Sequence, residues 1–79
     1  MNSMFRLSRE TVAELRECFP KGSRVRLVRM NDPYCYNLKV GSLGTVVGVD
    51  DVGTIHVAWD CGSSLGVVYG EDLCERIDG

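Results

Sequence analysis

The sequence lacks the features that mark several large classes of protein. No apolar run approaches the roughly 20 residues of a membrane-spanning helix, and Met1–Glu10 carries two arginines without an apolar segment behind them. We therefore expect no membrane association, no signal peptide and a cytoplasmic location. The chain has one histidine and no Cys-x-x-Cys motif, so the paired ligands of a zinc ribbon or zinc knuckle are missing.

The four cysteines are spread too widely to indicate a ligand cluster. Cys18, Cys35, Cys61 and Cys74 are far apart in the chain. Four cysteines would suit two disulfides in a small secreted protein, but nothing in the sequence indicates export. We predict reduced thiols, some of them filling the core as small apolar groups.

Size and charge limit the remaining possibilities. The chain has 79 residues, 44% of them apolar, which is enough for one domain with a small core and too apolar for a disordered tail. Residues 1–39 hold eight Lys and Arg against four Asp and Glu, a formal charge of +4, and residues 40–79 hold one against seven, or −6. This asymmetry indicates either a charged interaction face or two halves that lie side by side and neutralise each other.

One amphipathic helix is predicted near the start of the chain. Ser8 is a good N-cap residue, and Val12, Leu15 and Phe19 form one apolar stripe at helical spacing. Pro20 and the glycine at position 22 end the pattern. We predict a flexible segment over 1–7, a helix over 8–19 and a second unit over 20–79.

Residues 20–79 have the two-residue period of β-strands. Five short apolar–polar alternations begin near Arg24, Thr45, Ile55, Leu65 and Leu73, separated by turns rich in glycine and aspartate. A sheet this small would expose two edges, which closure would remove. The fold class predicted is mainly β, with an N-terminal helix before a small five-stranded barrel. Its predicted core consists of Val25, Leu27, Val46, Ile55, Val57, Trp59, Val67, Leu73 and Ile77.

An ordered string of motifs resembles a known family. Pro20–Leu27 leads to Met30–Pro33, and then to Gly44–Asp51, Ile55–Asp60 and Gly62–Leu65. These motifs resemble the domain-of-unknown-function family four-three-one-four, small proteins of bacteria, their phages and conjugative elements. The resemblance extends from about residue 8 to residue 77. It implies a small phage or mobile-element protein, in the host cytoplasm if a phage encodes it, that regulates or inhibits a host system.

Two wider resemblances concern the barrel. The Gly-x-Val strand followed by the Trp59-Asp60 turn is similar to Mib-Herc2 domains and to KOW-type modules, both of which are SH3-like barrels. The former recognise peptides and the latter bind RNA or proteins, so the resemblance implies a binding module. The chain differs from the family at Cys61, where a small polar residue is usual, and over 34–40, where the family loop is rich in proline.

The leading functional prediction is a non-enzymatic module that binds a protein or peptide. SH3-like barrels present a groove beside the long loop after the first strand, and this loop contains Asp32, Tyr34 and Tyr36. Tyrosine suits interfaces because it combines an apolar body with a polar tip. Trp59 and Asp60 complete the predicted site, although the phase of Trp59 with Ile55 and Val57 favours a core position.

Two alternatives stay open beside protein binding. Lys21, Arg24, Arg26 and Arg29 form a basic strip that would suit a nucleic-acid backbone, with the loop tyrosines stacking on bases. The acidic second half of the chain argues against it. A homodimer or other self-assembly is the other alternative, because a core this small gains stability from association.

No enzymatic activity, metal site or cofactor is predicted. His56, Asp60, Ser63 and Ser64 include the residue types of a hydrolase triad, but the aspartate and Ser63 belong to one tight turn, where local hydrogen bonds explain them. The acidic residues show no EF-hand spacing, and turn formation accounts for them.

Overall fold

The structure is a computed structural model that describes residues 8–31 and 38–78. Its elements are α1 (Arg9–Cys18), β1 (Arg24–Arg29), β2 (Leu43–Val49), β3 (Thr54–Trp59), β4 (Val67–Val68) and β5 (Leu73–Arg76). The prediction of a mainly β protein with one N-terminal helix and five strands is confirmed. The proposed division of the chain into a tail, a helix and a second unit stays a prediction.

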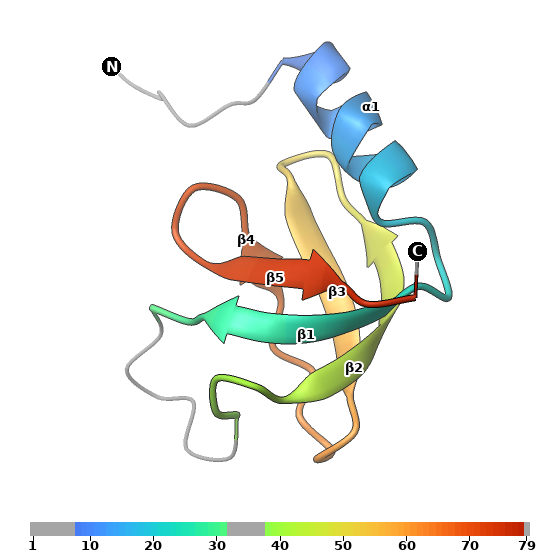
Figure 1. The fold of residues 1–79 in the computed structure, drawn as a ribbon. Helices are drawn as coiled ribbons and strands as arrows, with labels where there is room; N and C mark the ends of the chain where they lie inside the picture. Colours follow the sequence, from blue (N-terminus) through green and yellow to red (C-terminus); the bar gives the residue numbers. More distant parts are fainter. Residues whose placement is uncertain (1–7, 32–37, 79) are drawn as a thin grey trace.

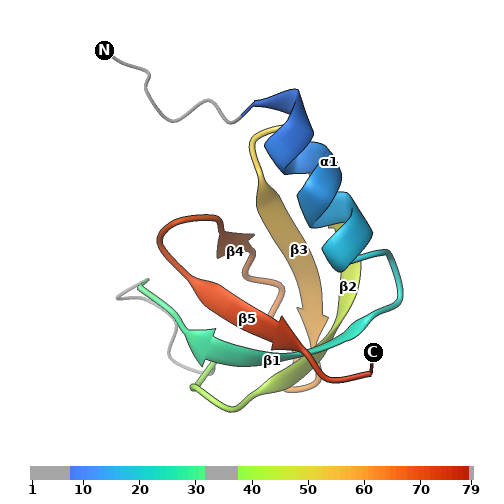
Figure 2. The ribbon, with the colours of Figure 1, turned by 45° about the horizontal axis from the view of Figure 1, so that its top comes forward.

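Helix α1 begins and ends where the sequence signals lie. The Ser8 hydroxyl accepts a hydrogen bond of 3.1 Å from the Thr11 amide, which satisfies one of the free donors of the first turn. Val12 and Leu15 are the buried residues of the helix. Figure 2 shows α1 lying over the end of the sheet where β2 turns into β3. At ten residues α1 is far too short to cross a bilayer, and no helix among the described residues is long and apolar enough to do so.

The five strands form one antiparallel sheet in the order β4-β3-β2-β1-β5. The prediction of a closed barrel was wrong, because β4 and β5 are edge strands and the described residues contain no ladder that joins them. An isolated bridge between Tyr69 and Asp72 lies in the turn between these two strands. β4 has two residues, and the Val68 carbonyl accepts hydrogen bonds from the Glu71 and Asp72 amides of its own turn. A strand this short, whose backbone groups are bonded within its own turn, has few free groups with which another strand could pair.

The core consists of side chains from one face of all five strands. Seven of the nine predicted core residues are buried there, but Leu73 and Ile77 are exposed, which corrects the prediction for β5. Cys74 takes their place because the register sets it opposite Leu27, and facing residues of paired strands share a side of the sheet. Leu38, which follows the loop, is the other core residue that the sequence pattern did not indicate.

Candidate functional site

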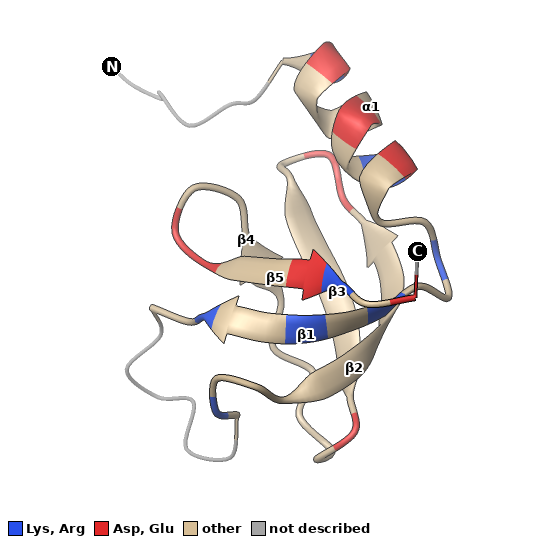
Figure 3. Ribbon diagram, viewed as in Figure 1, with Lys and Arg blue, Asp and Glu red and all other residues tan. Residues whose placement is uncertain are grey.

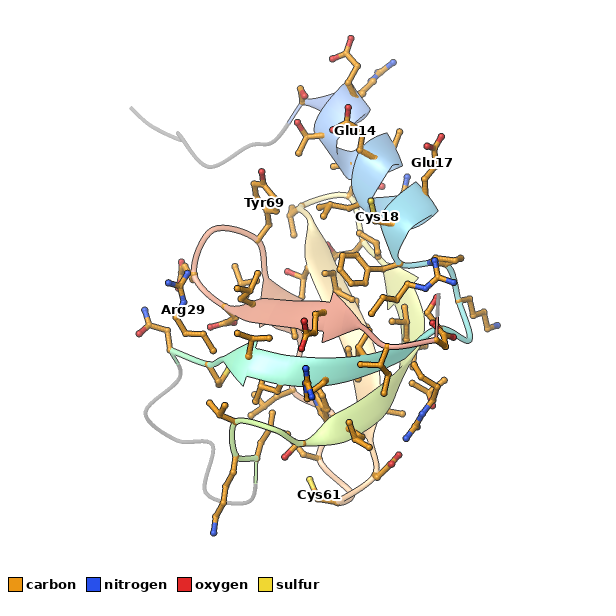
Figure 4. All side chains as sticks on the ribbon, in the orientation of Figure 1. Glu14, Glu17, Cys18, Arg29, Cys61 and Tyr69 are labelled. Carbon is orange, nitrogen blue, oxygen red and sulfur yellow. The ribbon has the colours of Figure 1, made fainter. Side chains whose placement is uncertain are left out.

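β1 presents two of the predicted basic residues on the outer face of the sheet. Arg24 and Arg26 are two positions apart and alternate with Val25 and Leu27, which are buried. Lys21 is exposed in the turn before the strand. Arg29 follows a shift in register and projects from the far end of β1, near the turn between β4 and β5 (Figure 4). The predicted basic strip is thus divided between two ends of one strand.

Arg24 is held by a carboxylate from the turn that follows β3. Its Nη1 and Nη2 donate to the two carboxylate oxygens of Asp60 at 2.9 and 2.6 Å, and Nη1 also donates to the Thr45 hydroxyl at 2.8 Å. The hydrogen bonds from Arg24 lower the pKa of the Asp60 carboxyl below its ordinary value and outweigh the opposite effect of desolvation. The guanidinium therefore lies fixed across β2 rather than extended into solvent.

Arg26 has a second carboxylate partner. It lies opposite Glu75 of β5, and its Nε donates to Glu75 Oε2 at 2.8 Å, with Nη2 bonded to the same oxygen. Figure 3 shows a basic position in the middle of β1 beside an acidic position of β5. The two arginines and two carboxylates sum to no net charge, so this part of the sheet is strongly polar but electrically balanced.

Exposed apolar side chains complete the same face. Leu43 lies opposite Arg26 on β2, and the Ile77 amide donates to the Arg24 carbonyl, which sets Ile77 beside that arginine. Their exposed fractions are 38% and 45%. We name this surface the paired-arginine face; it comprises Arg24, Arg26, Leu43, Thr45, Asp60, Glu75 and Ile77.

The predicted aromatic site is only partly on this surface. Asp32, Tyr34 and Tyr36 lie outside the described residues, so their role stays a prediction. Trp59 is 3% exposed in the core, and its Nε1 donates to the Leu65 carbonyl at 2.8 Å. Its ring therefore has no surface to offer a partner. Of the predicted partner-binding residues that are described, Asp60 alone is at the surface.

The residues that resemble a hydrolase triad are not assembled into one. Asp60 is paired with Arg24, whereas His56 bonds through Nε2 to Asp50 at 2.8 Å. The Ser63 hydroxyl accepts a bond from the Leu65 amide within its own turn. His56 and Ser63 have partners nearby in the chain, as the turn chemistry predicts. Asp60 instead pairs with Arg24, and the Gly62 amide of its turn donates to the Trp59 carbonyl, which corrects the prediction of local hydrogen bonds for Asp60.

Asp50 holds the histidine from the turn between β2 and β3. Its Oδ1 accepts from the Val52 and Thr54 amides at 3.1 and 2.9 Å, and its Oδ2 contacts His56. Desolvation would raise the pKa of the Asp50 carboxyl, but these hydrogen bonds outweigh it and lower the pKa below the ordinary value. Asp50 therefore stays ionised at neutral pH.

A hollow of about 570 Å³ lies beside β4, and no motif in the sequence indicates it. One wall comes from β3 through Thr54 and His56. A second wall comes from the residues that end and follow β1 and from the β4–β5 turn. These two segments are linked, because the Asp72 carboxylate accepts a hydrogen bond of 2.8 Å from the Asn31 amide. Residues from four separate segments meet here, which explains why no local motif predicts the hollow.

The described cysteines, Cys18, Cys61 and Cys74, are free, and the prediction that all four thiols are reduced stays a prediction. Cys18 and Cys61 are exposed, and Figure 4 shows Cys61 in the turn that follows β3. Cys74 is buried in the core, and desolvation raises the pKa of its thiol to about 11. Cys35 lies outside the described residues.

Comparison with known proteins identifies a family and no individual relative. Residues 8–77 match the family described as a domain of unknown function, DUF4314. No curated protein matches the chain, and no solved structure matches it. The likeness to SH3-like, Mib-Herc2 and KOW-type domains, and the origin in a phage or mobile element, stay predictions.

Proposed function

The chain belongs to the DUF4314 family, a domain family of unknown function, and we propose that it is a non-enzymatic module that binds a protein through the paired-arginine face. The observation that carries this proposal is the pairing of both arginines with carboxylates of the same face. Fixed arginines lose little side-chain freedom on association. Arginines beside exposed apolar groups are also typical of protein interfaces.

The balance of charge favours a protein over a nucleic acid. A phosphate backbone is attracted by uncompensated positive charge, and affinity grows with the number of phosphates that are neutralised. On this face Asp60 and Glu75 already compensate Arg24 and Arg26. A nucleic acid would have to displace both carboxylates or bind beside them, whereas a protein can contact the ion pairs and apolar groups together.

Capture from a bacterial lysate treated with nuclease tests the proposal. The tagged chain is compared with the variant Leu43→Asp, which replaces an exposed apolar side chain at the centre of the face with a carboxylate. The matched control is Val52→Asp, which makes the same kind of change at a residue 63% exposed in the turn between β2 and β3. We expect the wild-type chain and the control to retain the same protein and Leu43→Asp to lose most of it.

Three outcomes would contradict the proposal. Capture that disappears with nuclease and falls steeply with salt would favour the nucleic-acid alternative. Equal retention by Leu43→Asp and the control would place the contact elsewhere on the molecule. Recovery of the bait alone, with a dimeric mass in solution, would favour self-assembly. A double variant, Tyr34→Ala with Tyr36→Ala, tests separately whether the loop contributes to the same contact.

A further inference from the structure

The hollow beside β4 is negatively charged. Its titratable lining residues are His56, Glu71 and Asp72, and among the residues that the structure describes no lysine or arginine is part of the lining, although Arg29 lies near the β4–β5 turn. The Asp72 carboxylate is buried and fixed, because its two oxygens accept from the Asn31 and Val68 amides at 2.8 and 3.0 Å. Glu71 is exposed beside it in the same turn. A ligand that carries positive charge is therefore favoured over a neutral or anionic one.

His56 adds a hydrogen-bond acceptor of defined position. Since the ionised Asp50 carboxylate contacts Nε2, a neutral imidazole keeps its proton on that nitrogen, and Nδ1 is left with a lone pair. Nδ1 lies on the side of β4, 3.9 Å from where a Cβ at position 66 would stand. Thr54 and Ser64 line the same space. The lining therefore includes polar residues from β3 and from the segment before β4.

The rest of the lining is apolar. Met30, Leu65 and Val68 contribute hydrocarbon surface, and Met30 and Leu65 pack against the core behind it. Such walls suit a chain of methylene groups that ends in a charged head. The hollow thus combines an apolar passage with acceptors and negative charge.

We propose that this hollow binds the side chain of an arginine from a partner peptide. A guanidinium offers five N–H donors in one plane, which can serve acceptors on several sides at once, whereas a lysine ammonium offers three donors from one nitrogen. The methylene stem of the arginine lies against Met30, Leu65 and Val68, and the head lies between His56 and Glu71. This site is separate from the paired-arginine face and does not depend on the function proposed for that face.

Titration with small ligands tests the site on the unaltered protein. The probe is N-acetyl-arginine amide, and the matched control ligand is N-acetyl-citrulline amide, which has the same shape without the charge. Amide NMR signals of Thr54, His56, Gly66 and Glu71 are followed in both titrations. We expect saturable shifts at these residues with the arginine ligand and none at equal concentrations of the citrulline ligand.

A pair of variants tests the role of the acidic rim. Glu71→Gln removes a charge from the hollow, and we expect it to weaken binding of the arginine ligand about twofold to fivefold, as for an exposed ion pair. Glu14→Gln, on the exposed side of α1, makes the same change far from the hollow and is expected to leave binding unchanged. The proposal would be overturned if the citrulline ligand caused equal shifts, or if no shifts were seen at all. It would also be overturned if a third ligand, Nα-acetyl-lysine amide, bound as well as the arginine ligand or better.

Discussion

At the scale of single residues, Gly44 shows how little space the core leaves. A Cβ built at this position would lie 2.6 Å from Val57 Cγ1 and 2.8 Å from Trp59 Cε3. These distances are shorter than real carbon contacts allow. β2 therefore needs glycine here so that the Trp59 ring and the Val57 side chain can pack against its backbone.

We predict that Gly44→Ala lowers the free energy of unfolding by about 1–3 kcal/mol, the usual range for overpacking a core. The control is Gly48→Ala in the same strand, where a Cβ would meet nothing within 4 Å. It should change stability by less than about 1 kcal/mol, in the stabilising direction, because alanine restricts the unfolded chain. Urea unfolding followed by the fluorescence of Trp59 measures both. Equal effects of the two variants would show that the close contacts at position 44 carry no cost.

The last strand shows where residue patterns mislead. The alternation from Leu73 to Ile77 predicts the correct two-residue period but the wrong face. Apolar residues stand on both sides of β5, and Cys74 is the one whose side chain enters the core. Pattern alone cannot choose between the two phases, because the choice depends on the register with β1. The pairing of Arg24 with Asp60 was equally hidden, since the two residues are distant in the sequence.

At the scale of elements, α1 is attached to the sheet by two kinds of contact. Val12 and Leu15 are buried beneath the helix. On its flank, Arg16 donates through Nε to the Val49 carbonyl at 3.1 Å and through Nη2 to Asp51 at 2.8 Å. The side chain of Asp51 is 96% exposed, so solvent screens this ion pair strongly. The apolar contact should therefore dominate the attachment.

Two variants separate these contributions. Leu15→Ala should lower the free energy of unfolding by about 2–3 kcal/mol, because it leaves a cavity under the helix. Arg16→Ala should lower it by less than about 1 kcal/mol, as is usual for exposed ion pairs. Urea unfolding of both proteins gives the comparison. A larger loss for the arginine variant would mean that the polar contacts to the β2–β3 turn, rather than burial, hold the helix.

The sequence was a good guide to which elements exist and a poor guide to how the sheet ends. The helix cap at Ser8 and the turn residues are local signals, so α1 and the strand positions followed from them. Closure into a barrel depends instead on whether β4 is long enough to reach β5. β4 has only two residues, and it ends in a turn where the Val68 amide donates to the Asp72 carboxylate. The alternation over 65–69 did not indicate this turn.

At the scale of the whole molecule, the uneven distribution of charge along the chain is resolved by the fold. The first half carries a formal +4 and the second half −6. Three ion pairs join the halves, namely Arg16–Asp51, Arg24–Asp60 and Arg26–Glu75. The interpretation that the two halves lie side by side and neutralise each other is confirmed for these residues. The uneven distribution of charge therefore provides ion pairs between the two halves of the folded chain, whether or not it also contributes to a binding surface.

This pairing predicts a loss of stability in acid. The folded state lowers the pKa of Asp60 through hydrogen bonds from Arg24, and that of Asp78 through the Arg76 side chain and the Arg24 amide. The pKa of Asp50 is also lowered in the folded state. A carboxyl whose folded pKa lies below its unfolded pKa contributes stability above the unfolded value, about 4, and loses it as the pH falls through the folded value.

We therefore expect that these carboxyls do not change the free energy of unfolding between about pH 6 and pH 5. Below about pH 4 the free energy of unfolding should fall steadily. Urea unfolding at a series of pH values, followed through the buried Trp59, measures the slope. Asp60→Asn removes one of the groups that must be protonated, so its curve should be flatter in acid than that of the wild-type chain. Glu14→Gln, with the same loss of charge on exposed helix surface, should leave the wild-type slope nearly intact. A wild-type stability that stays constant to pH 3 would contradict the prediction, and a slope that Asp60→Asn does not reduce would mean that the Arg24–Asp60 pair contributes nothing to the folded state.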